Sequence, residues 1–207
     1  MSALGGLPRK IADAPLNPSS AAPHLVAHGT EIAYVVQDAG GTGTVQIFLE
    51  FRSLGTANTR RLLLPGVRPN REQLSWSPDE RYVAYVDNQS GRSEVSQLWI
   101  LRIADGEAVP ITDAVTFNVS PSWSPDGRIV YYVSNKGGSR DLWQQWVTDA
   151  GLPNGEPERV SVGVGMSRAV ISSDGTCLAY VDGGTIGNAW RVPILDDAPT
   201  TWAEQNS

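Results

Sequence analysis

The sequence predicts an all-β repeat protein, and three observations lead to this fold class. A short polar motif that ends in a tight turn occurs three times, at residues 75–80, 122–127 and 170–175. The copies are separated by almost equal lengths of chain, within the range of about 40–50 residues that is typical of repeat architectures. Each copy runs directly into an apolar segment, and no part of the chain shows the sustained 3.6-residue apolar spacing that indicates helix.

The turn in each motif has a local cause. In one copy Pro125 fixes φ at the second turn position, Asp126 can bond the backbone two residues further on, and Gly127 accepts a positive φ. The preceding copy has Glu80 at the glycine position. We therefore expect that turn to be longer or mildly strained.

The strand after each turn is apolar at nearly every position rather than alternating. This pattern is typical of strands in sheets that are covered on both faces. A tyrosine stands at the same place in each strand, and a fourth such unit with a degraded turn precedes the three clear copies. The four tyrosines are Tyr34, Tyr85, Tyr132 and Tyr180. The sequence therefore contains four repeats.

Two further strands complete each repeat. The third strand carries an aromatic side chain at a matching place: Phe48, Trp99, Trp143 and Trp190. A fourth strand is readable at residues 60–64, 108–112 and 158–162, and the innermost strands should start near residues 23, 73, 120 and 168. Four antiparallel strands with both faces covered, repeated with this period, describe the blade of a β-propeller.

One run carries a family resemblance. Residues 122–128, the apolar strand that ends at residues 132–135, and Asp141-Leu142-Trp143 together resemble a blade of the TolB-type β-propeller family. The resemblance covers roughly residues 20–195, and it extends to WD-repeat propellers only in architecture. Members of that family serve as periplasmic interaction proteins, as sensor domains of membrane-anchored kinases or winged-helix regulators, and as propeller domains of prolyl oligopeptidase-type hydrolases. The resemblance therefore implies the fold more strongly than the function.

The ends of the chain fall inside blades. Residues 3–12 align without gaps on residues 103–112, so residues 1–14 should hold the last strand of a preceding blade or a closing strand. Two explanations stay open. The chain is part of a propeller of six or more blades, which we favour, or residues 7–12 close a four-bladed ring beside residues 188–195. The blades themselves are expected at residues 15–65, 66–113, 114–163 and, incomplete, 164–207.

Composition limits the function classes. The net charge of −6 and the isoelectric point near 4.9 argue against nucleic acid as a partner, because phosphates require a basic surface. The single Cys177 is expected to be a small buried hydrophobe. No apolar run suits a signal peptide or a membrane span. Localisation stays open, and it would be periplasmic or extracytoplasmic in a TolB-like or membrane-anchored sensor protein.

No catalytic or ligand-binding pattern stands out. His24 and His28 lack the further ligands that a metal site needs. The nearest string to a nucleophile elbow, residues 165–169, lacks the second glycine. Tryptophans at repeat-equivalent positions should fill the space between adjacent blades, whereas Trp146 should lie on the opposite face of its strand. We therefore predict no catalytic residue, no cofactor and no metal.

The loops at the two ends of the propeller differ in charge. The loops at one end carry balanced charges over the second to fourth repeats, and those at the other end are strongly acidic. We expect the acidic end to stay solvated and the neutral, arginine-bearing end to bind, because arginine is enriched at interface hot spots. Arg71, Asn118 and Met166 should border the central funnel at the binding end.

Two functions remain in view. The first is a non-catalytic interaction or sensor propeller that binds a protein or a small ligand at its loop face. The alternative is the accessory propeller of a prolyl oligopeptidase-type serine hydrolase whose catalytic domain lies outside this chain. In a partial propeller, the open blade edges should also promote association.

Overall fold

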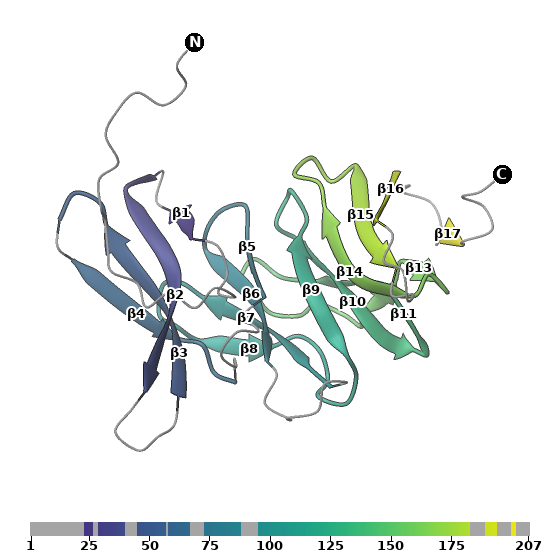
Figure 1. The fold of residues 1–207 in the computed structure, drawn as a ribbon, viewed down its shortest axis with the longest axis horizontal. Helices are drawn as coiled ribbons and strands as arrows, with labels where there is room; N and C mark the ends of the chain where they lie inside the picture. The colour runs from purple at the N-terminus through teal and green to yellow at the C-terminus, as the bar shows by residue number, and fades with distance from the viewer. Residues whose placement is uncertain are drawn as a thin grey trace, which may run out of the picture.

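The computed structural model describes residues 23–26, 29–39, 45–56, 58–66, 73–87, 95–182, 189–193 and 200–201. These residues form three four-stranded antiparallel sheets, one three-stranded antiparallel sheet and one short two-stranded parallel sheet, and they contain no α-helix (Figure 1). The all-β fold class and its propeller blades are thereby confirmed. Within the described part of the chain, no helix could cross a membrane.

Within each blade the strands follow the order of the chain, and neighbouring strands are antiparallel. Blade 1 comprises β1 (His24–Val26), β2 (Glu31–Ala39), β3 (Val45–Ser53) and β4 (Thr59–Leu63). Blade 2 comprises β5 (Leu74–Trp76), β6 (Tyr82–Asp87), β7 (Gln97–Arg102) and β8 (Ala108–Pro110). Blade 3 comprises β9 (Asn118–Trp123), β10 (Ile129–Gly137), β11 (Ser139–Trp146) and β12 (Glu158–Arg159).

Blade 4 has three described strands: β14 (Met166–Ile171), β15 (Cys177–Asp182) and β16 (Ala189–Pro193). Two short segments, β13 (Ser161–Val162) and β17 (Thr200–Thr201), pair in parallel. The innermost strands β1, β5, β9 and β14 start within two residues of their predicted positions. The possible closing strand at residues 7–12 lies outside the described residues, and the blade boundaries stay predictions.

The fourth strands of blades 2 and 3 are shorter than the sequence predicts, and side-chain hydroxyls explain why. In blade 2 the amide of Leu98 donates to the Thr112 hydroxyl oxygen at 2.9 Å. In blade 3 the amide of Leu142 donates to the Ser161 hydroxyl oxygen, also at 2.9 Å. A hydroxyl therefore replaces the next backbone carbonyl of the ladder, and β8 and β12 end early.

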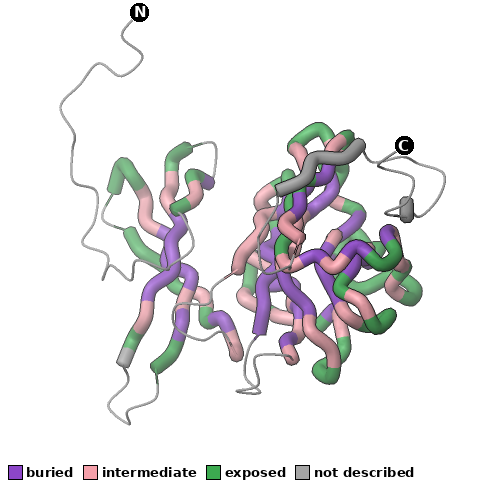
Figure 2. Tube along the Cα trace, turned by 45° about the vertical axis from the view of Figure 1, so that its right-hand side comes forward, coloured by how far each residue is buried: buried purple, intermediate pink, exposed green. Residues whose placement is uncertain are grey.

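The core lies between the blades rather than within one sheet (Figure 2). Between blades 1 and 2, Leu49 and Phe51 pack against Val83 and Tyr85. Every residue of β6 is buried, because blade 1 covers one of its faces and blade 3 the other. The predicted covering of both sheet faces is thus confirmed for the middle of the chain.

Repeated aromatic residues fill these interfaces, as predicted. Tyr85, Tyr132 and Tyr180 each pack in the cluster shared with the preceding blade. Trp123 and Trp143 of blade 3 lie in the cluster shared with blade 2. By contrast, the Trp146 side chain is exposed, in agreement with its predicted position on the opposite face.

The expectation that Cys177 is buried is wrong. Its side chain is half-buried, while Leu178 and Tyr180 of the same strand pack against blade 3. Since side chains alternate along a strand, Cys177 belongs to the other face of β15, which faces away from blade 3.

The turn aspartates bond the backbone as predicted. Asp126 Oδ1 accepts the Arg128 amide at 3.1 Å and the Ser124 hydroxyl at 2.6 Å. Asp79 accepts the Arg81 amide at 3.1 Å, and Asp174 accepts the Thr176 amide at 3.0 Å. Hydrogen bonds to Ser172 and then Thr176 lower the pKa of Asp174 to about 2.

Turn strain also follows the prediction. Glu80 has φ of 57°, a backbone conformation that residues other than glycine rarely adopt, and the matching Gly127 has φ of 71°.

The turns of neighbouring blades also touch. A Cβ on Gly127 would lie 3.7 Å from Pro78 Cδ, and one on Gly175 would lie 2.9 Å from Pro125 Cγ. Each of these glycines therefore lies against the proline of the preceding turn.

Asp141, part of the family-like motif, ties blade 3 to blade 4. Its buried carboxylate accepts the Ser139 hydroxyl, the Arg159 guanidinium and, at 2.9 Å, the amide of Val164 in the connection to β14. Burial raises the pKa of this carboxyl, but the hydrogen bonds from Ser139 and Arg159 outweigh it and hold the pKa below its ordinary value. Asp141 is therefore ionised and fully bonded inside the fold.

We predict that Asp126→Ala destabilises the protein by about 1 kcal/mol, the usual scale for losing such a local hydrogen-bonded group. Urea unfolding followed by tryptophan fluorescence measures the change. Glu156→Ala, at an exposed position in the loop before β12 of the same blade, is the control and should leave stability unchanged. An Asp126→Ala midpoint equal to that of the wild type would contradict the role of the turn carboxylate.

Candidate functional site

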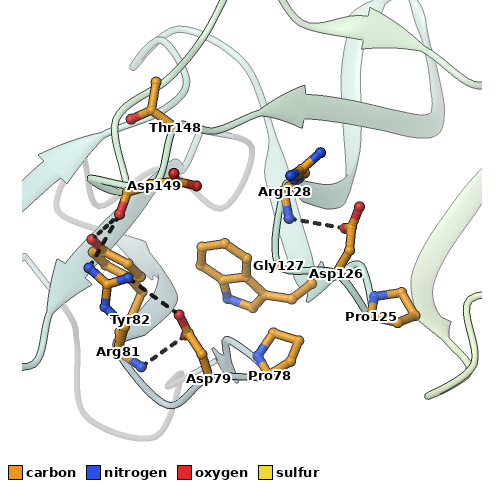
Figure 3. Close-up of a pocket in the computed structure, with 11 residues that line it drawn as sticks. Pro78, Asp79, Arg81, Tyr82, Pro125, Asp126, Gly127, Arg128, Thr148 and Asp149 are labelled. Carbon is orange, nitrogen blue, oxygen red and sulfur yellow. Dashed lines mark hydrogen bonds and ion pairs between the residues drawn. The ribbon is translucent and has the colours of Figure 1, made fainter.

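A recess of about 290 Å³ lies between blades 2 and 3, beside the turns that join β5 to β6 and β9 to β10 (Figure 3). It is lined by Pro78, Asp79, Arg81, Tyr82, Trp123, Pro125, Asp126, Gly127, Arg128, Thr148 and Asp149. Three separate segments of the chain contribute, so packing of the blades creates the recess.

Two aromatic side chains form the apolar part of the recess. The Tyr82 and Trp123 rings are roughly parallel, with centroids 6.3 Å apart. Trp123 Nε1 donates to the Ser75 carbonyl at 3.0 Å, and the Tyr82 hydroxyl donates to the Asp149 carbonyl at 2.8 Å. Both rings are thus fixed by bonds that cross the interface between blades 2 and 3, which makes this surface rigid.

Two arginines stand on opposite sides of the recess (Figure 3). The Arg81 guanidinium lies 5.4 Å from the Tyr82 ring centroid, and its NH2 donates to the Asp149 carbonyl at 3.4 Å. It also lies 3.8 Å from the Asp79 carboxylate. The Arg128 side chain is exposed, while its amide is held by Asp126. The rim therefore offers two cationic groups above an aromatic floor.

The loop after β11 closes one side of the recess. Val147 donates its amide to the Arg128 carbonyl at 2.8 Å, and Gly151 donates to the Thr148 carbonyl at 2.9 Å. Gly151 has φ of 74°, and a Cβ there would lie 2.5 Å from Tyr82 Cε1. Only glycine lets the loop approach the tyrosine ring this closely.

The lining carries charged side chains of both signs. None of the eleven lining residues is a serine, cysteine or histidine. The hydrogen bond from the Ser124 hydroxyl lowers the pKa of Asp126, so this carboxylate is ionised at neutral pH. Two arginines and three aspartates leave the recess close to neutral. Among the described residues, no group of three potential ligands could hold a metal ion.

The two described residues among those predicted from the sequence lie away from the recess. Arg71 is outside the described residues. Asn118 and Met166 are each 1% exposed, at the starts of β9 and β14. The Asn118 side-chain amide donates to the carbonyls of Ser96 at 2.7 Å and Thr116 at 3.2 Å. Both described residues are internal to the fold, and their part in binding stays a prediction.

Sequence reasoning missed the recess because it lies at the acidic end, which we expected to stay solvated. One signal could have pointed to it. In the first two clear copies of the motif an arginine follows the turn, as Arg81 and Arg128. Tyr82 then occupies the position held by Ile129 and Cys177 in the other two copies. A tyrosine at that one repeat position places a second ring beside Trp123 of the next blade.

Residues 14–192 match the TolB beta propeller domain family. The chain belongs to this family. No curated protein matches the sequence of this TolB-type propeller.

Solved structures share the fold at low identity. TolB from Acinetobacter baumannii is 18% identical over 84% of this chain and 41% of its own, with a TM-score of 0.62. A puromycin-hydrolyzing peptidase from Mycobacterium tuberculosis is 17% identical over 87% of this chain and 31% of its own, also with a TM-score of 0.62. The β-propeller domain of the Trilobed protease from Pyrococcus furiosus is 14% identical over 86% of this chain and 54% of its own, with a TM-score of 0.54.

These similarities place the chain in a fold that occurs in TolB proteins and in peptidases. This TolB-type propeller spans about two fifths of the length of the Acinetobacter protein. At such identities the likeness concerns the fold alone, and the function has to be argued from the site.

We predict that Gly151→Ala destabilises the protein more than Gly155→Ala does. Both glycines have positive φ, of 74° and 77°, but nothing lies within 4 Å of a Cβ on Gly155. Gly155→Ala should therefore cost roughly 1 kcal/mol for the backbone alone. Gly151→Ala adds a clash with Tyr82 of about 1–3 kcal/mol, the usual range for overpacking. Thermal unfolding of both variants measures the difference, and equal melting temperatures would contradict the close approach of the loop.

Proposed function

We propose that this TolB-type propeller is a non-catalytic interaction domain that binds a segment of a protein partner in the recess between blades 2 and 3. The observation that carries the proposal is the rigid Tyr82 and Trp123 floor flanked by Arg81 and Arg128. Aromatic residues and arginine are the side chains that dominate interface hot spots. A sensor domain would use the same surface.

The size of the recess supports a peptide segment over a cofactor. Its volume of about 290 Å³ is at the lower end of the range of about 300–1,000 Å³ for small-molecule sites. Pro78 and Pro125 stand beside the aromatic floor and have no backbone donors, so they add apolar surface. The arginine side chains and the carboxylates of Asp79 and Asp149 can then bond the backbone or polar groups of a bound segment.

The end predicted from the sequence, with Arg71, Asn118 and Met166, is proposed as a second contact surface. The burial of Asn118 and Met166 favours a role in holding the loops there rather than in touching a partner.

A periplasmic or otherwise extracytoplasmic location of the protein would agree with its being a TolB-like interaction protein.

Random peptides selected on the immobilised chain provide a test. We predict that Arg128→Glu and Arg81→Glu each weaken binding of the selected peptides by about tenfold or more, measured by calorimetry. The matched control is Lys136→Glu, which makes the same charge change in the hairpin between β10 and β11 at the opposite end. Circular dichroism checks that all variants are folded.

Two outcomes would contradict the recess as the binding surface. One is that no peptide is enriched. The other is that the selected peptides lose affinity with Lys136→Glu and keep it with Arg128→Glu, which would support the end predicted from the sequence.

The alternative function is the accessory propeller of a prolyl oligopeptidase-type hydrolase. Similarity to the puromycin-hydrolyzing peptidase and to the propeller domain of the Trilobed protease favours it. In that case the recess would hold part of a peptide substrate, and the catalytic residues would belong to another domain.

Under both functions we predict that the purified chain does not cleave peptide anilides or p-nitrophenyl esters. The assay compares the chain with buffer over several hours, before and after a second purification. Cleavage that is absent from buffer and stays in proportion to the chain after the second purification would overturn the non-catalytic assignment.

A further inference from the structure

The loop between β11 and β12 contains the one Asn-Gly pair of the sequence, Asn154-Gly155. Both residues are exposed. Among the described residues, no group bonds the Asn154 side-chain amide and no acceptor takes the Gly155 amide hydrogen. Gly155 has φ of 77°, and nothing lies within 4 Å of the place that a Cβ would take. The side-chain carbonyl carbon of Asn154 and the next backbone nitrogen are therefore both unhindered.

Three Asp-Gly pairs lie wholly within the described residues, and their turns hold the corresponding groups in hydrogen bonds. In each pair the glycine amide donates to an earlier backbone carbonyl, at 2.9 Å for Gly106, 3.0 Å for Gly127 and 2.9 Å for Gly175. The carboxylate of each pair accepts the amide two residues further on, at 3.0–3.1 Å. The turns thus bind both of the groups that the Asn-Gly pair leaves unbonded.

We propose that Asn154 is a site of spontaneous deamidation in the folded chain. The Gly155 nitrogen gives its proton to solvent base and attacks Cγ of Asn154. The new C–N bond closes a five-membered succinimide while the bond to the side-chain nitrogen breaks and ammonia leaves. Water, the only co-reactant, then opens the ring at either carbonyl to give aspartate or isoaspartate. Because both reacting groups belong to adjacent residues, the step is intramolecular and needs no encounter.

The isoaspartate product would alter bonds that hold this loop. Gln145 is 1% exposed, and its Nε2 donates to the carbonyls of Asn154 at 3.4 Å and Gly155 at 3.1 Å. In isoaspartate the former Asn154 carbonyl becomes a carboxylate off the main chain, and one additional carbon leads to Gly155. The two acceptors then no longer have the spacing that the buried amide of Gln145 fits, and an unpaired buried donor is costly.

The same loop forms part of the recess wall. Thr148 and Asp149 line the recess, and Gly151 lies against the Tyr82 ring. Deamidation of Asn154 would therefore be a slow and irreversible change beside the recess. The inference does not rest on the proposed function, because it concerns only the chemistry of the chain itself.

Peptide mapping by mass spectrometry tests the proposal on the full chain, incubated at mildly alkaline pH both folded and in urea. Residue 154 of the folded chain should gain one dalton and contain isoaspartate, at a rate within about tenfold of the rate in urea, since no bond has to open first. The three Asp-Gly pairs should form isoaspartate in urea and do so at least about tenfold more slowly in the folded chain. An intact Asn154 in the folded chain after the urea sample has deamidated fully would overturn the proposal. Equal rates at Asn154 and at the Asp-Gly pairs of the folded chain would overturn it as well.

Two variants separate the chemistry from its effect on the loop. Gly155→Ala should slow deamidation by about tenfold or more, because a methyl group then crowds the attacking nitrogen. Asn154→Asp carries the charge of the product on a normal backbone and should unfold at the urea concentration of the wild type. The aged wild type that contains isoaspartate should unfold at a lower one. Circular dichroism checks that both variants are folded. An unchanged rate in Gly155→Ala, or equal midpoints for Asn154→Asp and the aged chain, would contradict the proposed reaction or its effect on the loop, respectively.

Discussion

Side chains that repeat along the chain pack one sheet face onto the next, and this contact holds every blade in place. In blades 2 and 3, the tyrosine of the second strand and the tryptophan of the third strand pack in the cluster shared with the preceding blade. A single blade could not bury these rings, since its own sheet is one layer thick. Stability therefore resides in the interfaces, as in other repeat proteins, and each blade depends on its neighbours.

The same contact creates the recess. Tyr82 belongs to blade 2 and Trp123 to blade 3, and each is fixed by a bond to a carbonyl of the other blade. Packing of blade 2 against blade 3 also places the arginines and aspartates of the two turns around the recess. Binding and stability are thus coupled here, because a change that separates blades 2 and 3 also opens the floor of the site.

The fold was predictable from the sequence because it depends on local and repeated signals. Turns such as Pro125-Asp126-Gly127 act through their own backbone, and the period of the copies fixes the blades. The ends of β8 and β12 were not predictable, since they depend on where the hydroxyls of Thr112 and Ser161 lie in space. The recess was not predictable from the sequence for a similar reason. Gly151 and Tyr82 are far apart in sequence, and nothing local indicates that the loop reaches the ring.

The contact between neighbouring turns makes the order of the blades matter. Gly127 of blade 3 lies against Pro78, and Gly175 of blade 4 lies against Pro125. Blade 2 has Glu80 at the position of these glycines, and in sequence Ala27 stands at the repeat position of Pro78. If blade 2 were moved behind blade 3, Glu80 would meet Pro125 where the close approach requires a glycine. The four units are therefore not freely interchangeable: a duplicated blade 3 or 4, whose turn carries glycine, could follow a proline turn, whereas a duplicated blade 2 could not.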